Sequence, residues 1–179
     1  MNKQMNLAGW NKSLFLSVLL LMGTVAEADP LKDFNGKPQA IKNFTGQGKW
    51  LVVMIWASDC HVCNVEAKHY IHFHDRYKNK NARILGISID GQAKKAEAEK
   101  FIQRHHTTFP NLIGEPLEVA QWFVDLTGAD WVGTPTFLIY NPKGDLVVQQ
   151  VGAVPVKLIE DFIQKESKSN PTPENHTDI

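Results

Sequence analysis

Two stretches of the chain are almost entirely apolar and carry no helical spacing. Residues 50–56 and residues 83–90 are rich in β-branched, aromatic and other apolar side chains, with little polar alternation. This pattern is typical of strands that are buried on both faces of a sheet. A third run, residues 133–140, enters a strand through a proline. We therefore predict two interior strands and a later strand that begins near Pro135.

Apolar residues at three- and four-residue spacing predict helices around these strands. In residues 60–77 the inward-facing positions are Ala67, Tyr70, Ile71 and His74. The other helices are expected at residues 93–105, at residues 117–126 after a proline suited to the first helical position, and at residues 156–165.

Turn residues predict the remaining elements. Asn35-Gly36 favours a small N-terminal hairpin, and residues 141–144 favour a turn into an antiparallel strand at residues 145–151. A short extended piece is expected at residues 109–113. Strands and helices alternate early in the chain, which favours parallel pairing, and the late hairpin adds an antiparallel edge. The predicted fold class is therefore α/β, with a mixed sheet flanked by helices.

The first 28 residues have the features of a secretory signal peptide. Lys3 and Lys12 precede a short apolar run, and Ala26-Glu27-Ala28 fits the small-x-small cleavage pattern. We expect cleavage after Ala28, an exported periplasmic protein, a folded domain over residues 29–166 and a flexible tail over residues 167–179. An uncleaved N-terminal anchor is the weaker alternative, because the apolar run is shorter than the roughly 20 residues that span a bilayer.

The chain has 179 residues, with 19 Lys and Arg against 19 Asp and Glu. This length suits one domain with its own core. The charges balance and no long basic run occurs, so nucleic acid is not expected as a partner. We expect a monomer.

The only two cysteines, Cys60 and Cys63, follow the first interior strand and begin the first helix. Unpaired N–H groups and the helix dipole favour negative charge there, and a CxxC pair in this position can lower a thiol pKa. Cys60 is the expected nucleophile and Cys63 the resolving thiol. The cofactor requirement is then none beyond the redox-active Cys60–Cys63 disulfide.

Two other uses of the pair remain open. A structural disulfide across two residues would constrain little of the unfolded chain, which favours a reversible couple. CxxC is also half of a zinc site. His69 and His72 point elsewhere on the predicted helix, but His105 or His106 could converge on the pair from a distance. We therefore expect no metal, with a metal-binding module as the alternative.

Residues 56–63, Trp-Ala-Ser-Asp-Cys-His-Val-Cys, together with Gly133-Thr134-Pro135-Thr136-Phe137, resemble the thioredoxin superfamily. The likeness is closer to exported TlpA/ResA-like thiol-disulfide oxidoreductases and covers roughly Asp33 to Ile163. It implies a thioredoxin fold with a TlpA-type N-terminal hairpin and a central insertion, which is the helix and extended piece over residues 93–113.

The resemblance also implies roles for single residues. Pro135 matches the family's cis-proline, so the Thr134–Pro135 bond is expected to be cis and to face the CxxC. Thr134, Pro135 and Trp56 are expected in the substrate-binding part of the site, with Trp56 packing against the active-site turn. Glu66 matches a glutamate near the active site of ResA-like members, where it could take a proton from Cys63; a solvated glutamate is the alternative.

Three positions depart from the family pattern. Met54 replaces the buried acid of thioredoxin, so that proton path is missing. Asp59 stands where an aromatic residue is common, and its charge disfavours the neighbouring thiolate. His61, between the cysteines, does the reverse if it is protonated or donates a hydrogen bond, and we expect it to tune the redox potential.

The resemblance implies thiol-disulfide exchange with exported protein substrates. Its members act mostly as reductants, including in apocytochrome c maturation, and draw electrons from a membrane partner. An oxidase or isomerase on the same fold is the main alternative. A peroxidase is the weaker one, because no Pro and Thr precede a single nucleophilic cysteine.

Overall fold

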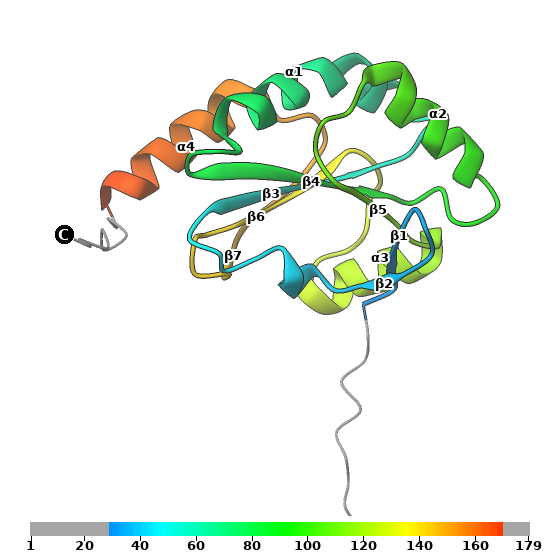
Figure 1. Ribbon diagram of the computed structural model, residues 1–179. Helices are drawn as coiled ribbons and strands as arrows, with labels where there is room; N and C mark the ends of the chain where they lie inside the picture. The colour runs from blue at the N-terminus through cyan, green and yellow to red at the C-terminus, as the bar shows by residue number, and fades with distance from the viewer. Residues whose placement is uncertain (1–28, 170–179) are drawn as a thin grey trace, which may run out of the picture.

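Seven strands form one mixed sheet in the computed structural model, in the order β2-β1-β5-β4-β3-β6-β7 (Figure 1). The structure describes residues 29–169, so the expected signal peptide lies outside the described residues. The strands are β1 Leu31–Asp33, β2 Pro38–Gln39, β3 Trp50–Trp56, β4 Ala82–Ser88, β5 Asn111–Ile113, β6 Thr136–Tyr140 and β7 Leu146–Val151. The helices are α1 His61–Tyr77, α2 Lys95–His105, α3 Pro116–Thr127, α4 Val156–Ser169 and the short 3₁₀ helix η1 Ile41–Asn43.

Strand β3 lies inside the sheet, between β4 and β6, and all seven of its residues are buried. Its alternate side chains enter two different cores. Trp50, Val52, Met54 and Trp56 pack with residues of α1, α2 and α4, whereas Leu51, Val53 and Ile55 pack with residues of α3 and β1. Figure 1 shows α1, α2 and α4 over one face of the sheet and α3 under the other. The lack of polar alternation in the sequence therefore reflects burial on both faces.

The strand directions confirm the mixed sheet. Strand β4 pairs in parallel with both β3 and β5, whereas β6 runs antiparallel to β3 and pairs with β7 as a hairpin. The consequence for function is that the carboxyl end of β3 and the amino end of β6 lie side by side at one end of the strands, where Ile55 pairs with Thr136. The loops that carry the cysteines and the Thr134–Pro135 bond leave the sheet at this end.

The N-terminal hairpin extends the same sheet. Strands β1 and β2 are antiparallel, and β1 also pairs antiparallel with β5 of the central insertion. The Asp33 side chain accepts hydrogen bonds from the backbone N–H groups of Asn35 and Lys37, at 2.9 and 3.0 Å. Gly36 lies within this turn with a φ of +86°, a conformation that favours glycine. The hairpin thus extends the sheet beyond β5.

Helix α4 is longer than its sequence pattern predicts. It continues to Ser169, so residues 167–169, which we assigned to the tail, are helical. The indole Nε1 of Trp50 donates a hydrogen bond to Ser167 Oγ at 3.1 Å, and Phe162 packs edge-on against the same indole. This contact joins residues more than a hundred positions apart, so local periodicity carries no sign of it.

Candidate active site

The cysteines lie where β3 passes into α1. Cys60 is the N-cap residue of α1, and its sulfur accepts a hydrogen bond from the backbone N–H of Cys63 at 3.1 Å. The two residues form a disulfide with a Cα–Cα distance of 5.2 Å. Cys63 is fully buried and Cys60 is partly exposed. The helix start therefore leaves Cys60 accessible and keeps Cys63 behind it. The unpaired N–H groups at this end of the helix stabilise a thiolate on Cys60.

A tight turn, residues 57–60, connects the strand to Cys60. The backbone N–H of Cys60 donates to the Ala57 carbonyl at 3.2 Å. Ser58, within the turn, is bound through its backbone N–H and hydroxyl to the buried carboxylate of Asp90, at 2.9 and 2.6 Å. Asp90 follows the carboxyl end of β4 and is only 6% exposed. The sequence pattern missed this contact, although Asp90 directly follows an interior strand.

The amide of Asn64 holds the other side of the turn. Its Nδ2 donates to the carbonyls of Ser58 and Cys60, at 3.1 and 2.9 Å. Its Oδ1 lies 2.8 Å from the guanidinium of Arg104 and 3.0 Å from Nε2 of His105, both on α2. The insertion helix is thereby linked to the active-site turn. Nothing in the local sequence pattern marks the link from Asn64 to α2, because Arg104 and His105 lie about forty residues away.

The acidic neighbour of Cys60 is paired. The Asp59 carboxylate lies 3.0 Å from Nζ of Lys94, at the start of the insertion helix. Both side chains are exposed, so the pair contributes little to stability. It nevertheless places a cation next to the charge that we expected to oppose thiolate formation, and it raises the pKa of Lys94.

The loop before β6 reaches the same end of the strands. The Thr134–Pro135 peptide bond is cis. The Pro135 carbonyl accepts a hydrogen bond from the Gly152 N–H at 2.8 Å, and the Thr136 hydroxyl bonds the Gly133 carbonyl at 2.5 Å. Since Thr136 pairs with Ile55, these contacts fix the loop beside the end of β3 and the cysteine turn that follows it.

Trp56 is not available to a substrate. Its side chain is 1% exposed, stacks on Phe101 with ring centroids 4.2 Å apart, and donates from Nε1 to Asn111 at 3.1 Å. The expected place in the substrate-binding part of the site is therefore corrected: Trp56 is a core residue that joins β3 to the central insertion. Burial on both faces of β3 is the physical reason.

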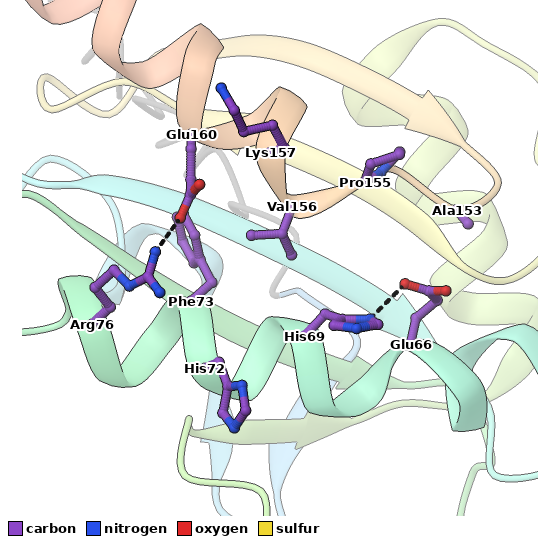
Figure 2. Close-up of a pocket in the computed structure, with 10 residues that line it drawn as sticks. All are labelled: Glu66, His69, His72, Phe73, Arg76, Ala153, Pro155, Val156, Lys157 and Glu160. Atoms are coloured by element: carbon purple, nitrogen blue, oxygen red, sulfur yellow. Dashed lines mark hydrogen bonds and ion pairs between the residues drawn. The ribbon is translucent and has the colours of Figure 1, made fainter.

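Glu66 and His61 both lie on the first turns of α1. His61 is exposed beside Cys60. Glu66 is partly exposed, and its carboxylate lies 3.1 Å from Nδ1 of His69. It lines one end of a groove of about 540 Å³ between α1 and α4, which continues to Arg76 and Glu160 (Figure 2). Glu66 is thus the groove residue nearest in sequence to Cys63.

His105, a histidine of the zinc alternative, contacts Asn64 instead. The buried His74 of α1 accepts the backbone N–H of Ile84 at its Nδ1. Between residues 29 and 169, no three or more His, Cys, Asp or Glu side chains are grouped as ligands for a metal ion. In the same part of the chain, none of the helices combines the length and apolarity that crossing a membrane requires.

The fold and the CxxC disulfide at a helix start define a thioredoxin-fold thiol-disulfide oxidoreductase. The chain belongs to the AhpC/TSA family, whose model matches residues 22–149. A curated relative is the thiol-disulfide oxidoreductase ResA of Halalkalibacterium halodurans, 24% identical over 134 residues, which cover 75% of this chain and 70% of the relative.

Solved structures show the same fold. The thiol:disulfide interchange protein of Chlorobium tepidum TLS has a TM-score of 0.62 at 17% identity and covers 77% of this chain and 94% of its own. A secreted disulfide oxidoreductase of Mycobacterium tuberculosis, described as homologous to DsbE of E. coli, has a TM-score of 0.54 at 21% identity. The match covers 71% of this chain and 88% of that protein.

Proposed function

We propose that the protein is an exported reductant of disulfides in protein substrates. The observation that carries the proposal is the asymmetry of the pair: Cys60 is partly exposed at the N-cap and accepts an N–H bond, whereas Cys63 is fully buried behind it. This arrangement suits one sulfur that attacks and one that resolves.

The reaction is a two-electron exchange. The Cys60 thiolate attacks one sulfur of the substrate disulfide, forms a mixed disulfide and releases the other sulfur as a thiolate, which takes up a proton. Cys63 then loses its proton and attacks Cys60, which forms the Cys60–Cys63 disulfide and releases the second substrate thiol. The enzyme pair is oxidised and the substrate reduced, so a further dithiol donor, which we propose is a membrane protein, must restore the reduced form.

Substrates would meet the enzyme at the end of the strands where the cysteines lie. We propose that backbone groups of Thr134 and Pro135 bind the substrate chain beside Cys60, as the TlpA/ResA resemblance implies. The secreted disulfide oxidoreductase of Mycobacterium tuberculosis supports an exported location. The TlpA/ResA resemblance implies apocytochrome c as one substrate.

A reduced, purified protein should reduce the disulfides of insulin in the presence of dithiothreitol. Cys60→Ser should abolish this activity, because the remaining thiol, Cys63, is fully buried and out of reach of a substrate disulfide. Cys63→Ser should accumulate mixed disulfides with protein substrates, which non-reducing electrophoresis and mass spectrometry detect. Full activity of Cys60→Ser, or no activity of the parent protein, would contradict the proposal.

Glu66 is proposed as the group that takes the proton of Cys63. Glu66→Gln should slow the resolving step roughly a hundredfold, as expected for loss of a general base, and leave the first attack unchanged. Stopped-flow measurement of both steps checks this. The matched control is Glu160→Gln, which removes a carboxylate from the far end of the same groove and should leave both steps unaltered.

A disulfide oxidase is the second candidate, favoured by His61 beside Cys60 at the helix start. A stable thiolate makes a stronger oxidant. The reduction potential decides between the two: a value near that of thioredoxin, about −270 mV, supports the reductant, and one near −120 mV supports the oxidase.

A further inference from the structure

Asp90 is a buried carboxylate next to the active-site turn that the proposed reaction does not use. It is 6% exposed and accepts hydrogen bonds from three donors: the Ser58 N–H at 2.9 Å, the Ser58 hydroxyl at 2.6 Å and the Ser88 hydroxyl at 2.7 Å. Its own backbone N–H donates to the Ser88 oxygen at 3.1 Å. Two elements, the end of β4 and the CxxC turn, are joined through this one side chain.

The contacts of Asp90 fit the ionised form. Ser58 donates to both carboxylate oxygens, and a backbone N–H can only donate. Each oxygen also has a serine hydroxyl within bonding distance, and a hydroxyl rotates to donate where an anion lies. Hydrogen bonds to a charged acceptor are stronger than those to a neutral one. Asp90 therefore places a negative charge behind the turn.

This charge is bonded to Ser58, within the turn that carries the attacking sulfur. The 57–60 turn is closed by the bond from the Cys60 N–H to the Ala57 carbonyl, so its ends are within about 7 Å. Ser58, which Asp90 holds, is the second residue of this turn. A buried negative charge bonded to this turn disfavours a second negative charge on Cys60.

The other charges near Cys60 are compensated or exposed. Asp59 is paired with Lys94, whose pKa is raised chiefly by that partner and only slightly by Asp90. Arg104 and His105 are bonded to Asn64, and the pKa of His105 is lowered, first by burial. His61 is exposed, and Glu66 contacts His69. Within residues 29–169, Asp90 is in no ion pair, so its charge is the least compensated of this set.

We propose that Asp90 is a positioning residue that holds the CxxC turn and, through its buried negative charge, biases the Cys60–Cys63 pair toward acting as a reductant. The inference deepens the proposed function and rests on it. A thiolate made less stable weakens the reduced form relative to the disulfide, so the pair gives up its electrons more readily. Asp90 would then counteract the helix N-terminus, which alone would favour an oxidant.

The test is to remove the charge in two ways, with Asp90→Asn and Asp90→Ser, and to titrate each protein in glutathione redox buffers. Both variants should be reduced more readily than the parent. The equilibrium constant for reduction of the Cys60–Cys63 disulfide by glutathione should rise roughly threefold or more. In a Cys63→Ser background, the pH midpoint of Cys60 alkylation should fall by about half a unit or more. Circular dichroism checks that each variant is folded.

Two controls separate charge from hydrogen bonding. Ser58→Ala removes a donor but leaves the carboxylate, and Asp59→Asn removes an exposed, paired charge; both should shift the equilibrium much less than Asp90→Asn. A shift in Ser58→Ala as large as in Asp90→Asn, an unchanged potential in both Asp90 variants, or failure of both to fold would overturn the proposal. The titration does not require substrate turnover, so its outcome is independent of the insulin assay.

Discussion

At the residue scale, His74 shows how one buried ring joins α1 to the sheet. It is 5% exposed, and its Nδ1 accepts a hydrogen bond from the Ile84 backbone N–H at 3.0 Å. Only the neutral ring can accept this bond. Burial, followed by the charge of Lys78, lowers the pKa of His74 below its ordinary value. The unfolded chain therefore binds this proton at a higher pH than the folded protein does.

Folding stability should consequently fall on acidification. The contribution of neutral His74 is complete above its unfolded pKa, about 6.5, and is lost as the pH falls below that value. Urea unfolding at pH 7.5 and pH 5.5 checks this. His74→Gln should cost about 1–3 kcal/mol at pH 7.5 and should lose less additional stability at pH 5.5 than the parent. Exposed His72→Gln is the control, and an equal pH effect in both variants would contradict the assignment.

At the scale of elements, Gly86 allows β4 to pass beneath the Trp56–Asn111 hydrogen bond. A Cβ at residue 86 would collide with Asn111 Oδ1 and come within 2.9 Å of Trp56 Nε1. The Asn111 amide cannot turn away without cost, because it also donates to the Phe109 carbonyl. This set of contacts joins β3, β4 and β5 just behind the active-site end of the strands.

Gly86→Ala should therefore destabilise the protein by about 1–3 kcal/mol, through overpacking and loss of the hydrogen bond. Chemical denaturation measures the change. In the double variant with Asn111→Ala the two effects should be clearly non-additive, because removal of Asn111 makes room for the new methyl group. Additive losses would show that the collision is not the cause.

At the scale of the whole molecule, the end of α4 closes the helical layer over β3. The Trp50–Ser167 bond and the Trp50–Phe162 contact hold this last part of the helix against the first residue of β3. A chain that stops at residue 165, where the sequence pattern of the helix ends, should therefore be less stable than one that stops at residue 169, by about 1 kcal/mol or more.

Thermal and urea unfolding of the two truncated chains test this difference. In the longer chain, Ser167→Ala should reproduce the part of the stability loss that is due to the hydrogen bond, about 0.5–1.5 kcal/mol. The control is Ser169→Ala, whose hydroxyl bonds the Lys165 carbonyl of its own helix. Equal stability of the two truncated chains would mean that the last turn is not held by the sheet.

Local spacing accounts for what could be predicted. The strand over residues 50–56, the helix that begins just after Cys60 and the late hairpin all follow from the chemistry of neighbouring residues. The strand predicted over residues 83–90 is also present, but it runs from Ala82 to Ser88. The position of the CxxC at a helix start follows from the same signals. These patterns define elements and their order, since burial on both faces or along one stripe leaves a local record in the sequence.

Neighbouring residues along the chain thus establish the class of fold, the two cysteines and their placement at the start of α1. The side chains around the cysteines follow from three-dimensional packing instead. It buried Trp56, bound Asn64 to α2 and placed Asp90 behind Ser58. These contacts join residues thirty or more positions apart, and periodicity within one element carries no information about a partner in another. Packing of the finished sheet and helices brings them together.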